Sequence, residues 1–235
     1  MNYLGSKRKL AKHILPIILK DRKPGQLYIE PFCGGCNTLA LVDNPRIGAD
    51  IHGPLIGMWQ AVALGWMPRA ITEDEYHSMK SLSQQVSVID PLITWAGFAC
   101  SFGAKWWGGF RKDPSGRRDY VQEALRNARQ QFPRLVGTTF IHTPYHALDL
   151  PQAPSIIYCD PPYASTTGYR DTTLDHVEFW KWCIETSHKG HHVYVSEYTI
   201  PDWVPATVLF QKTMSNTVCR NKTVTSTEYL VQVGR

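Results

Sequence analysis

The chain has 235 residues, of which 43% are hydrophobic and 19% charged, a composition typical of a globular protein rather than a disordered one. A chain of this length can bury a full core, so we expect one domain of moderate size or one domain with a large insertion. The formal net charge of +5 is compatible with a polyanionic partner but is weak evidence for one. No segment approaches the ~20 apolar residues that cross a bilayer, and no apolar signal region is present, so we expect a cytoplasmic protein without membrane contact.

Six cysteines raise the question of a metal site or a disulfide framework. Cys33 and Cys36 have the C-x-x-C spacing, but no second pair follows at the distance that a zinc site requires. The spacings of His146, His176 and the pair at 191–192 also fit no standard metal site. We therefore expect reduced thiols, as in a cytosolic protein, and no metal.

The first part of the chain predicts helices and strands in alternation. In order, these are a helix, a strand, a turn, a helix and a strand at residues 6–18, 27–30, 31–35, 37–43 and 46–50. The hydroxyl of Ser6 can cap the first helix, and Pro16 should kink or shorten it. The second strand ends in a carboxylate, Asp50.

Residues 55–136 differ in character, because helical patterns dominate there. The predicted helices are at residues 55–64, 73–80, 92–100 and 120–131. Strand patterns return at residues 139–142, 156–159, 192–196, 208–212 and 229–233, with a helix at 174–188. Strands that alternate with helices predict a mostly parallel α/β sheet. We expect residues 57–136 to form an inserted, mainly helical subdomain, and residues 1–56 and 137–235 to form the sheet domain.

A strand that runs into the glycine turn at residues 30–35 is suited to a ligand, because glycines let it approach the backbone closely. The turn is not G-x-G-x-x-G, and taken alone it is at least as compatible with a plain tight turn. Asp50 ends the next strand, where an acidic residue commonly binds ribose hydroxyls. A solvated carboxylate is the alternative for Asp50. Together the two features favour an adenosine-containing cofactor.

The strongest motif is the run Asp160-Pro161-Pro162-Tyr163 directly behind the apolar segment 155–159. Each proline fixes its φ and lacks an N–H, so the turn offers carbonyl acceptors without competing donors. A carboxylate and a carbonyl could accept both hydrogens of a ring amine and localise its lone pair, while the tyrosine stacks on the ring. A structural proline turn is the alternative interpretation.

Four motifs in this order resemble the Dam-like DNA adenine-N6 methyltransferases, a D12 class family in its alpha arrangement. The motifs are Tyr3-x-Gly5-Ser6-Lys7, Glu30-Pro31-Phe32-x-Gly34-Gly35, Ala49-Asp50-Ile51 and Asp160-Pro161-Pro162-Tyr163. The resemblance implies a Rossmann-like S-adenosylmethionine-dependent methyltransferase sheet with an inserted target-recognition subdomain at residues 57–136. It also implies a bacterial or phage-encoded enzyme, which could serve restriction–modification.

The resemblance assigns roles residue by residue. The expected cofactor-binding residues are Tyr3, Gly5, Lys7, Glu30, Pro31, Phe32, Cys33, Gly34, Gly35, Asp50, Ile51 and Asp160. The expected catalytic residues are Asp160, Pro161, Pro162 and Tyr163. Cys36 stands where the family prefers small residues, and the Asn-rich stretch that the family has near Arg111 is missing here.

A base inside a duplex cannot reach such a pocket, so the expected substrate is double-stranded DNA with a flipped adenine. The basic residues expected to contact DNA phosphates are Lys105, Arg111, Lys112, Arg117 and Arg118. Trp106 and Trp107 could form an aromatic wedge or simply pack the subdomain. The loop at residues 164–170 could be a lid or an ordinary connection. A monomer or weak dimer is expected.

Three other interpretations remain open. The same amine clamp could methylate RNA adenine or a protein glutamine amide, and the insertion should decide between them. A catalytically silent DNA-binding module would not need an intact clamp. A nicotinamide oxidoreductase is disfavoured, because G-x-G-x-x-G is missing.

Overall fold

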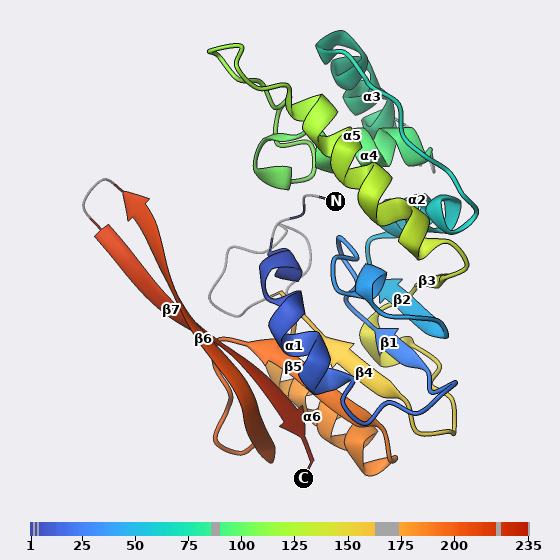
Figure 1. Cartoon of the computed structure of the whole chain (residues 1–235), viewed down its shortest axis with the longest axis vertical. Coiled ribbons are helices and arrows are strands. Elements are labelled where there is room, and N and C mark those ends of the chain that lie inside the picture. The colour runs from blue at the N-terminus through green and yellow to red at the C-terminus, as the bar shows by residue number, and fades with distance from the viewer. Residues whose placement is uncertain (2, 4, 86–89, 163–173, 220–221, 235) are drawn as a thin grey trace. The chain divides into compact units, whose positions relative to one another are not determined.

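The computed structural model describes all residues except 2, 4, 86–89, 163–173, 220–221 and 235, and it describes only the backbone of residues 85, 214–219 and 222–224. The strands are β1 (Tyr28–Glu30), β2 (Arg46–Asp50), β3 (Thr139–His142), β4 (Ile156–Cys159), β5 (His192–Glu197), β6 (Ala206–Cys219) and β7 (Lys222–Val233). The helices are α1 (Ala11–Ile18), α2 (Gly53–Ala63), α3 (Glu73–Gln85), α4 (Pro91–Ala99), α5 (Tyr120–Gln131) and α6 (His176–His188), labelled in Figure 1.

The strands form a seven-stranded sheet of order β3-β2-β1-β4-β5-β7-β6. The pairs β2–β3, β1–β4 and β4–β5 are parallel, whereas β7 is antiparallel to both β5 and β6. All four residues of β4 are buried, as expected for a central parallel strand with an uninterrupted apolar sequence. The order of the first five strands is that of a doubly wound sheet, which confirms the predicted Rossmann-like α/β fold.

The chain divides into two compact units. The first unit contains Met1–Ala11 and Cys33–Pro144, and the second contains Lys12–Phe32 and Tyr145–Arg235. This division by compactness does not test function, so the role of residues 57–136 in target recognition stays a prediction. Among the described residues, no helix is both long and apolar enough to span a membrane.

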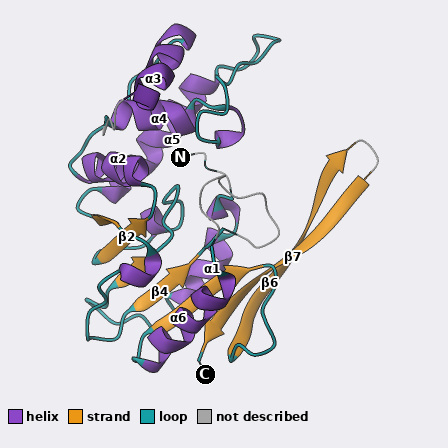
Figure 2. Cartoon of the chain, turned by 180° about the vertical axis from the view of Figure 1, so that it is seen from behind, coloured by secondary structure: helices purple, strands orange, loops and turns teal. Residues whose placement is uncertain are grey.

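The second unit is a helix–sheet–helix sandwich that continues into a long hairpin. Figure 1 shows α1 in front of β4 and β5, and Figure 2 shows α6 on the opposite face. Ile14 and Ile18 of α1 and Phe179 and Trp180 of α6 are buried there. The hairpin strands β6 and β7 run for 14 and 12 residues, much longer than the predicted strands at 208–212 and 229–233.

The first unit packs helices around β2 and the edge strand β3. Helix α2 contacts α4 and β3, and α3 contacts α4. Asp90 and Asp119 cap α4 and α5 by accepting hydrogen bonds from Leu92 N and Gln122 N. With these caps α5 begins at the predicted residue, Tyr120, and α4 begins at Pro91, one residue before its predicted start.

Two predicted helices near the start are shorter than expected. Ser6 accepts a hydrogen bond from Arg8 N, but it caps a single 3-10 turn at Lys7–Lys9, and α1 begins only at Ala11. Pro16 lies inside α1, which ends two residues later at Ile18. The predicted helix at 37–43 is a 3-10 turn at Leu39–Leu41, because Thr38 provides no side-chain cap and Val42 is already extended.

Arg46, at the start of β2, is a buried anchor for the first unit. Its guanidinium donates to Thr138 Oγ1 at 2.8 Å, to Leu39 O at 2.8 Å, and to the carbonyls of Val42 and Arg134. Buried carbonyls that lose a donor are costly, and hydrogen bonds to a charged group are stronger than neutral ones. One side chain therefore connects β2 with the segments before β2 and before β3.

We predict that Arg46→Met lowers the free energy of unfolding by about 3 kcal/mol or more, because the variant leaves several buried carbonyls without donors. Urea denaturation followed by circular dichroism measures this change. Arg134→Met is the matched control, since the exposed Arg134 contributes only its backbone carbonyl and this variant should unfold like the wild type. Equal stability of the two variants would contradict the anchoring role.

Candidate functional site

Tyr3 lies directly on the glycine turn. A Cβ atom built at Gly34 would be 2.8 Å from Tyr3 Cε1, and one built at Gly35 would be 2.6 Å from Tyr3 Cβ. Gly34 also has φ +43°, which favours glycine. The ring of Tyr3 continues against Phe98, with 5.3 Å between the centroids. The first unit thus brings together Tyr3 and the glycine turn, which the resemblance had placed in one cofactor site.

Asp50 fastens the same turn. Its Oδ2 accepts a hydrogen bond from Gly34 N at 3.0 Å, and its Oδ1 accepts one from His52 N at 2.9 Å. Burial raises the pKa of Asp50, and the backbone donors His52 and Gly34 oppose that rise by stabilising the carboxylate. The side chain therefore holds the turn against the end of β2, and each oxygen can still accept a further hydrogen bond from a ligand.

The other predicted cofactor-binding residues of the first unit differ in their burial. Lys7 is 5% exposed, and its Nζ donates to Gly5 O at 3.4 Å. Gly5 has φ +77°, so glycine is favoured at this bend. Cys33 is buried, whereas Ile51 beside Asp50 is about half exposed. Ile51 thus presents an apolar side chain next to the carboxylate.

The proposed catalytic turn belongs to the second unit. Asp160 follows β4 directly and is half-buried, Pro161 is buried and Pro162 is exposed. Tyr163 and the loop at 164–170 lie outside the described residues. The partial burial of Asp160 is compatible with a carboxylate that meets a ligand, and it does not exclude a structural turn.

A buried polar network lies around the strand ends that precede Asp160. Tyr158 shares a 2.8 Å hydrogen bond with Ser196 Oγ, and Tyr28 donates to Glu30 Oε1 at 2.8 Å. Burial raises the pKa of Tyr158 well above its usual value, and the charges of Asp160, Glu30 and Glu228 raise it further. Several carboxyl groups therefore surround a tyrosine hydroxyl that keeps its proton.

Two members of this network were missed in the sequence: Tyr28 and Glu228. Ser196 ends the predicted strand at 192–196, where it was expected to open on the site, although the sequence assigned it no role. A usable signal existed for Tyr28, because residues 28 and 30 of a short strand point to the same face. No sequence signal linked Glu228 to the network, since strand pairing in the hairpin brings it there. Glu30, which was predicted, is fixed by Tyr28 and is only 2% exposed.

Pro31 and Phe32 connect β1 to an aromatic cluster. Pro31 is buried, and the half-buried ring of Phe32 stacks on Tyr145 with 5.3 Å between centroids. Phe32 also meets Phe179 edge to face at 5.6 Å, and Tyr145 meets Trp182 at 5.3 Å. Phe32 is therefore locked in place by packing within the second unit.

The basic residues predicted to contact DNA are all in the first unit, and they differ in their surroundings. Lys105 and Arg117 are exposed. Arg111 stacks on the Tyr120 ring, with its Cζ 3.9 Å from the centroid. Lys112 pairs with Glu73 at 2.9 Å, and Arg118 makes two bonds to Glu123. Exposed ion pairs are weak, so phosphates could still displace these carboxylates.

The two tryptophans favour the packing alternative. A Cβ at Gly97 would be 2.5 Å from the Trp106 ring, and Trp106 lies 4.8 Å from Phe98. Trp107 meets Tyr76 edge to face at 5.0 Å. In contrast, the neighbouring Phe102 is 71% exposed. The exposed aromatic ring of this segment is therefore one that the sequence interpretation did not select.

Five cysteines among the described residues are buried thiols: Cys33, Cys36, Cys100, Cys159 and Cys183. Burial raises the pKa of Cys100 to about 12. Within the described part of the chain, no group of three or more His, Cys, Asp or Glu side chains could hold a metal ion.

His52 caps α2 with its imidazole. Its Nδ1 accepts a hydrogen bond from Leu55 N at 3.1 Å, and its ring meets Phe98 and Trp106 edge to face. The pKa of His52 is lowered to about 4, mainly by burial and in smaller part by the nearby His142. A protonated ring has no acceptor for Leu55, so the cap requires the neutral form.

We predict that the cap weakens as the pH falls. The pKa of His52 is about 4 in the folded protein and 6.5 for an unperturbed ring, so the unfolded state binds more protons between these values. Asparagine caps a helix at every pH, so His52→Asn serves as the reference. The free energy of unfolding of the wild type minus that of His52→Asn should decrease by about 1 to 3 kcal/mol from neutral pH to about pH 4. Urea denaturation at several pH values measures it, and a constant difference would contradict the prediction.

Comparison with known proteins links the first part of the chain to one family. None of the curated proteins matches the chain significantly. Among solved structures, the crystal structure of "SMU.472, a putative methyltransferase complexed with SAH" matches over 100% of this chain, with 12% sequence identity and a TM-score of 0.36, and the chain spans 55% of the length of that chain. Residues 3–87 match the family model of the D12 class N6 adenine-specific DNA methyltransferases, which confirms over this segment the family that the motifs indicated.

Proposed function

We propose that the protein is a site-specific DNA adenine-N6 methyltransferase that uses S-adenosylmethionine. The observation that carries the proposal is the interlocked arrangement of Tyr3, the Gly34–Gly35 turn and Asp50, because it unites three motifs that are far apart in the sequence. All three motifs lie within the segment that matches the D12 class family. The fourth motif adds an acceptor pair suited to a ring amine.

The residues of the first unit fit the proposed methyl donor. The glycine turn adds no side chains at Gly34 and Gly35, and the aromatic ring of Tyr3 lies directly beside it. Asp50 retains acceptor capacity for ribose hydroxyls, as an acid at this strand end commonly does. An aromatic ring also attracts a cation such as a sulfonium. When bound, S-adenosylmethionine supplies a methyl group on a positively charged sulfur.

In the proposed reaction, the Asp160 carboxylate and the Pro161 carbonyl accept the two N–H bonds of the adenine N6. These contacts localise the nitrogen lone pair, which is otherwise delocalised into the ring. With S-adenosylmethionine bound, the nitrogen would bond to the methyl carbon as the sulfur–carbon bond breaks, and S-adenosylhomocysteine would be the product. One proton then leaves N6, whose acidity rises sharply on methylation, so no dedicated base is required. Proximity and orientation provide most of the acceleration.

The substrate would be duplex DNA from which the adenine is flipped. The insertion at residues 57–136 would recognise the target, and Lys105, Arg111, Lys112, Arg117 and Arg118 would contact the backbone. RNA adenine and a glutamine amide remain the alternative acceptors. The deciding experiment incubates the protein with labelled S-adenosylmethionine and a panel of DNA duplexes, RNA duplexes and glutamine-containing peptides. Label in N6-methyladenine of DNA supports the proposal, and label confined to RNA or peptide overturns it.

We predict that Asp160→Ala lowers the rate of methyl transfer at least about a hundredfold, because it removes one of the two groups that polarise the amine. The fold should persist, since Asp160 is half-buried at the end of β4. Asp149→Ala, which removes an exposed carboxylate from the same unit, is the matched control and should keep full activity. Full activity of Asp160→Ala would refute the assigned role.

We predict that Asp50→Ala raises the dissociation constant for S-adenosylmethionine about tenfold or more while changing DNA affinity little. The variant loses both the acceptor for the cofactor and the bond that fixes Gly34. Isothermal titration calorimetry measures cofactor binding, and fluorescence anisotropy measures DNA binding. Asp74→Ala removes an exposed carboxylate of the first unit and serves as control. An unchanged cofactor affinity would contradict the prediction.

A further inference from the structure

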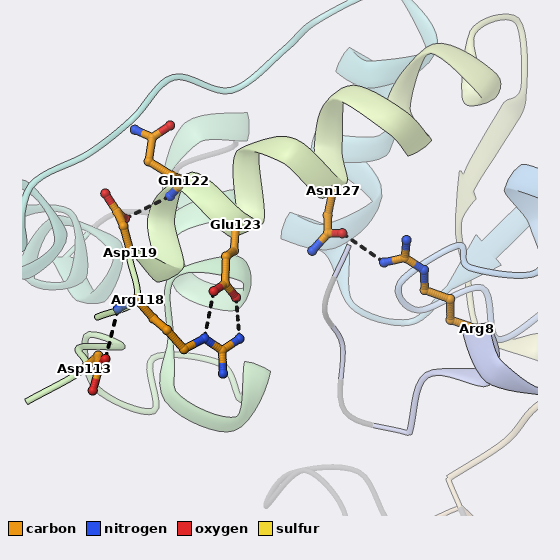
Figure 3. A network of polar contacts seen from close by, with 7 residues as sticks. All are labelled: Arg8, Asp113, Arg118, Asp119, Gln122, Glu123 and Asn127. Carbon is orange, nitrogen blue, oxygen red and sulfur yellow. Dashed lines mark hydrogen bonds and ion pairs between the residues drawn. The ribbon is translucent and has the colours of Figure 1, made fainter. Parts of the chain in front are cut away.

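One face of α5 contacts three arginines of the first unit, one from the N-terminal segment and two from the segment that precedes α5. Tyr120, Glu123 and Asn127 share this face, because helix positions three and four apart are neighbours. Arg111 lies over the Tyr120 ring, Arg118 pairs with Glu123, and Arg8 donates to Asn127 Oδ1 at 3.0 Å. Figure 3 shows Arg8 reaching α5 beside Asn127 and Arg118 held by Glu123. Three guanidinium groups therefore lie against this face, and one of them is paired with its carboxylate, Glu123.

The charges are not evenly compensated on this face. Both carboxylate oxygens of Glu123 accept hydrogen bonds from Arg118, Oε1 from Nε at 2.8 Å and Oε2 from Nη2 at 2.7 Å. Asn127 is neutral, and Tyr120 offers a ring face, so neither cancels the charge of Arg8 or Arg111. Among the described residues, no carboxylate forms an ion pair with Arg8 or Arg111. Arg118 lowers the pKa of Glu123 most, and Arg111 and Arg126 lower it further. Two positive charges therefore remain available.

Arg8 and Arg111 line the same pocket, which has a volume of about 270 Å³. The other lining residues are Met1, Tyr3, Ser6, Gly103 and Ala104. Gly103 and Ala104 both have positive φ, which bends the loop so that small residues face the pocket. A pocket with small walls and two guanidinium groups suits an anion with several oxygens, since each guanidinium can donate in a forked geometry.

We infer that this pocket holds one phosphodiester group of the DNA backbone, gripped by Arg8 and Arg111. The inference rests on the proposed function, and it adds a residue of the N-terminal segment to the expected DNA contacts. A phosphodiester is favoured because the pocket opens to the surface near the exposed Lys105, and the protein carries a net charge of +5. The contact positions the strand and carries no sequence information.

The test compares two variants that lose the same charge. Arg8→Gln with Arg111→Gln alters the pocket, and Arg69→Gln with Arg129→Gln removes two exposed arginines from elsewhere in the same unit. DNA affinity is measured by fluorescence anisotropy over a range of salt concentrations. The pocket variant should bind DNA about tenfold more weakly, and the slope of log affinity against log salt concentration should decrease by the amount expected for about one phosphate contact. The control should remain close to wild type. Unchanged thermal melting of both variants excludes misfolding.

A scan of the duplex with single methylphosphonates identifies the phosphate itself. A methylphosphonate at one position should weaken DNA binding by the wild type and leave the affinity of the pocket variant unchanged. If both proteins are sensitive at the same positions, or if the pocket variant loses cofactor affinity instead, the inference is overturned while the proposed function stands. If wild type shows no salt-dependent binding to any duplex, both the inference and the proposed function are overturned.

Discussion

The hydrogen bond from Gly34 to Asp50 is the constraint on which the first unit's candidate site depends. It fastens a turn without side chains to the end of β2, and Tyr3 then fills the space that a Cβ at Gly34 or Gly35 would need. Tyr3 thereby excludes a side chain at either glycine. A carboxylate, a bare backbone and an aromatic ring from distant parts of the sequence therefore form one unit of structure, and Arg46 anchors the strand that carries it.

In the second unit, several carboxyl groups lie near one buried tyrosine, Tyr158. Asp160 stands at the end of a fully buried strand, with Glu30 and Glu228 close enough to act on the same tyrosine. The hydroxyl of Tyr28 stabilises one of these carboxylates by donating a hydrogen bond to Glu30. A region this rich in carboxyl groups favours positive charge nearby. That preference agrees with the proposed sulfonium donor, whereas the arginines that lie against α5 suit the phosphates of the proposed DNA substrate.

Much of the fold could be predicted because its strands and helices have sharp local signals. The strand at 156–159 and the helix at 120–131 were predicted to the residue, the first from an uninterrupted apolar run and the second from its periodicity. The hairpin was predicted too short, because its outer part is rich in threonine and serine and is extended by pairing between β6 and β7. The partners Glu73 and Glu123 of the predicted DNA contacts, and the part played by Arg8, depend on tertiary packing that no local pattern encodes.

Burial raises the pKa of Tyr28 and of Tyr158 well above the usual value for tyrosine. In alkaline solution the accessible phenols become phenolate first, whereas these two must stay protonated for as long as their sheet remains closed. The ultraviolet absorbance of phenolate can consequently report the alkaline unfolding of the second unit. A late, abrupt step in that signal would mark the opening of the second unit without any label attached to the chain.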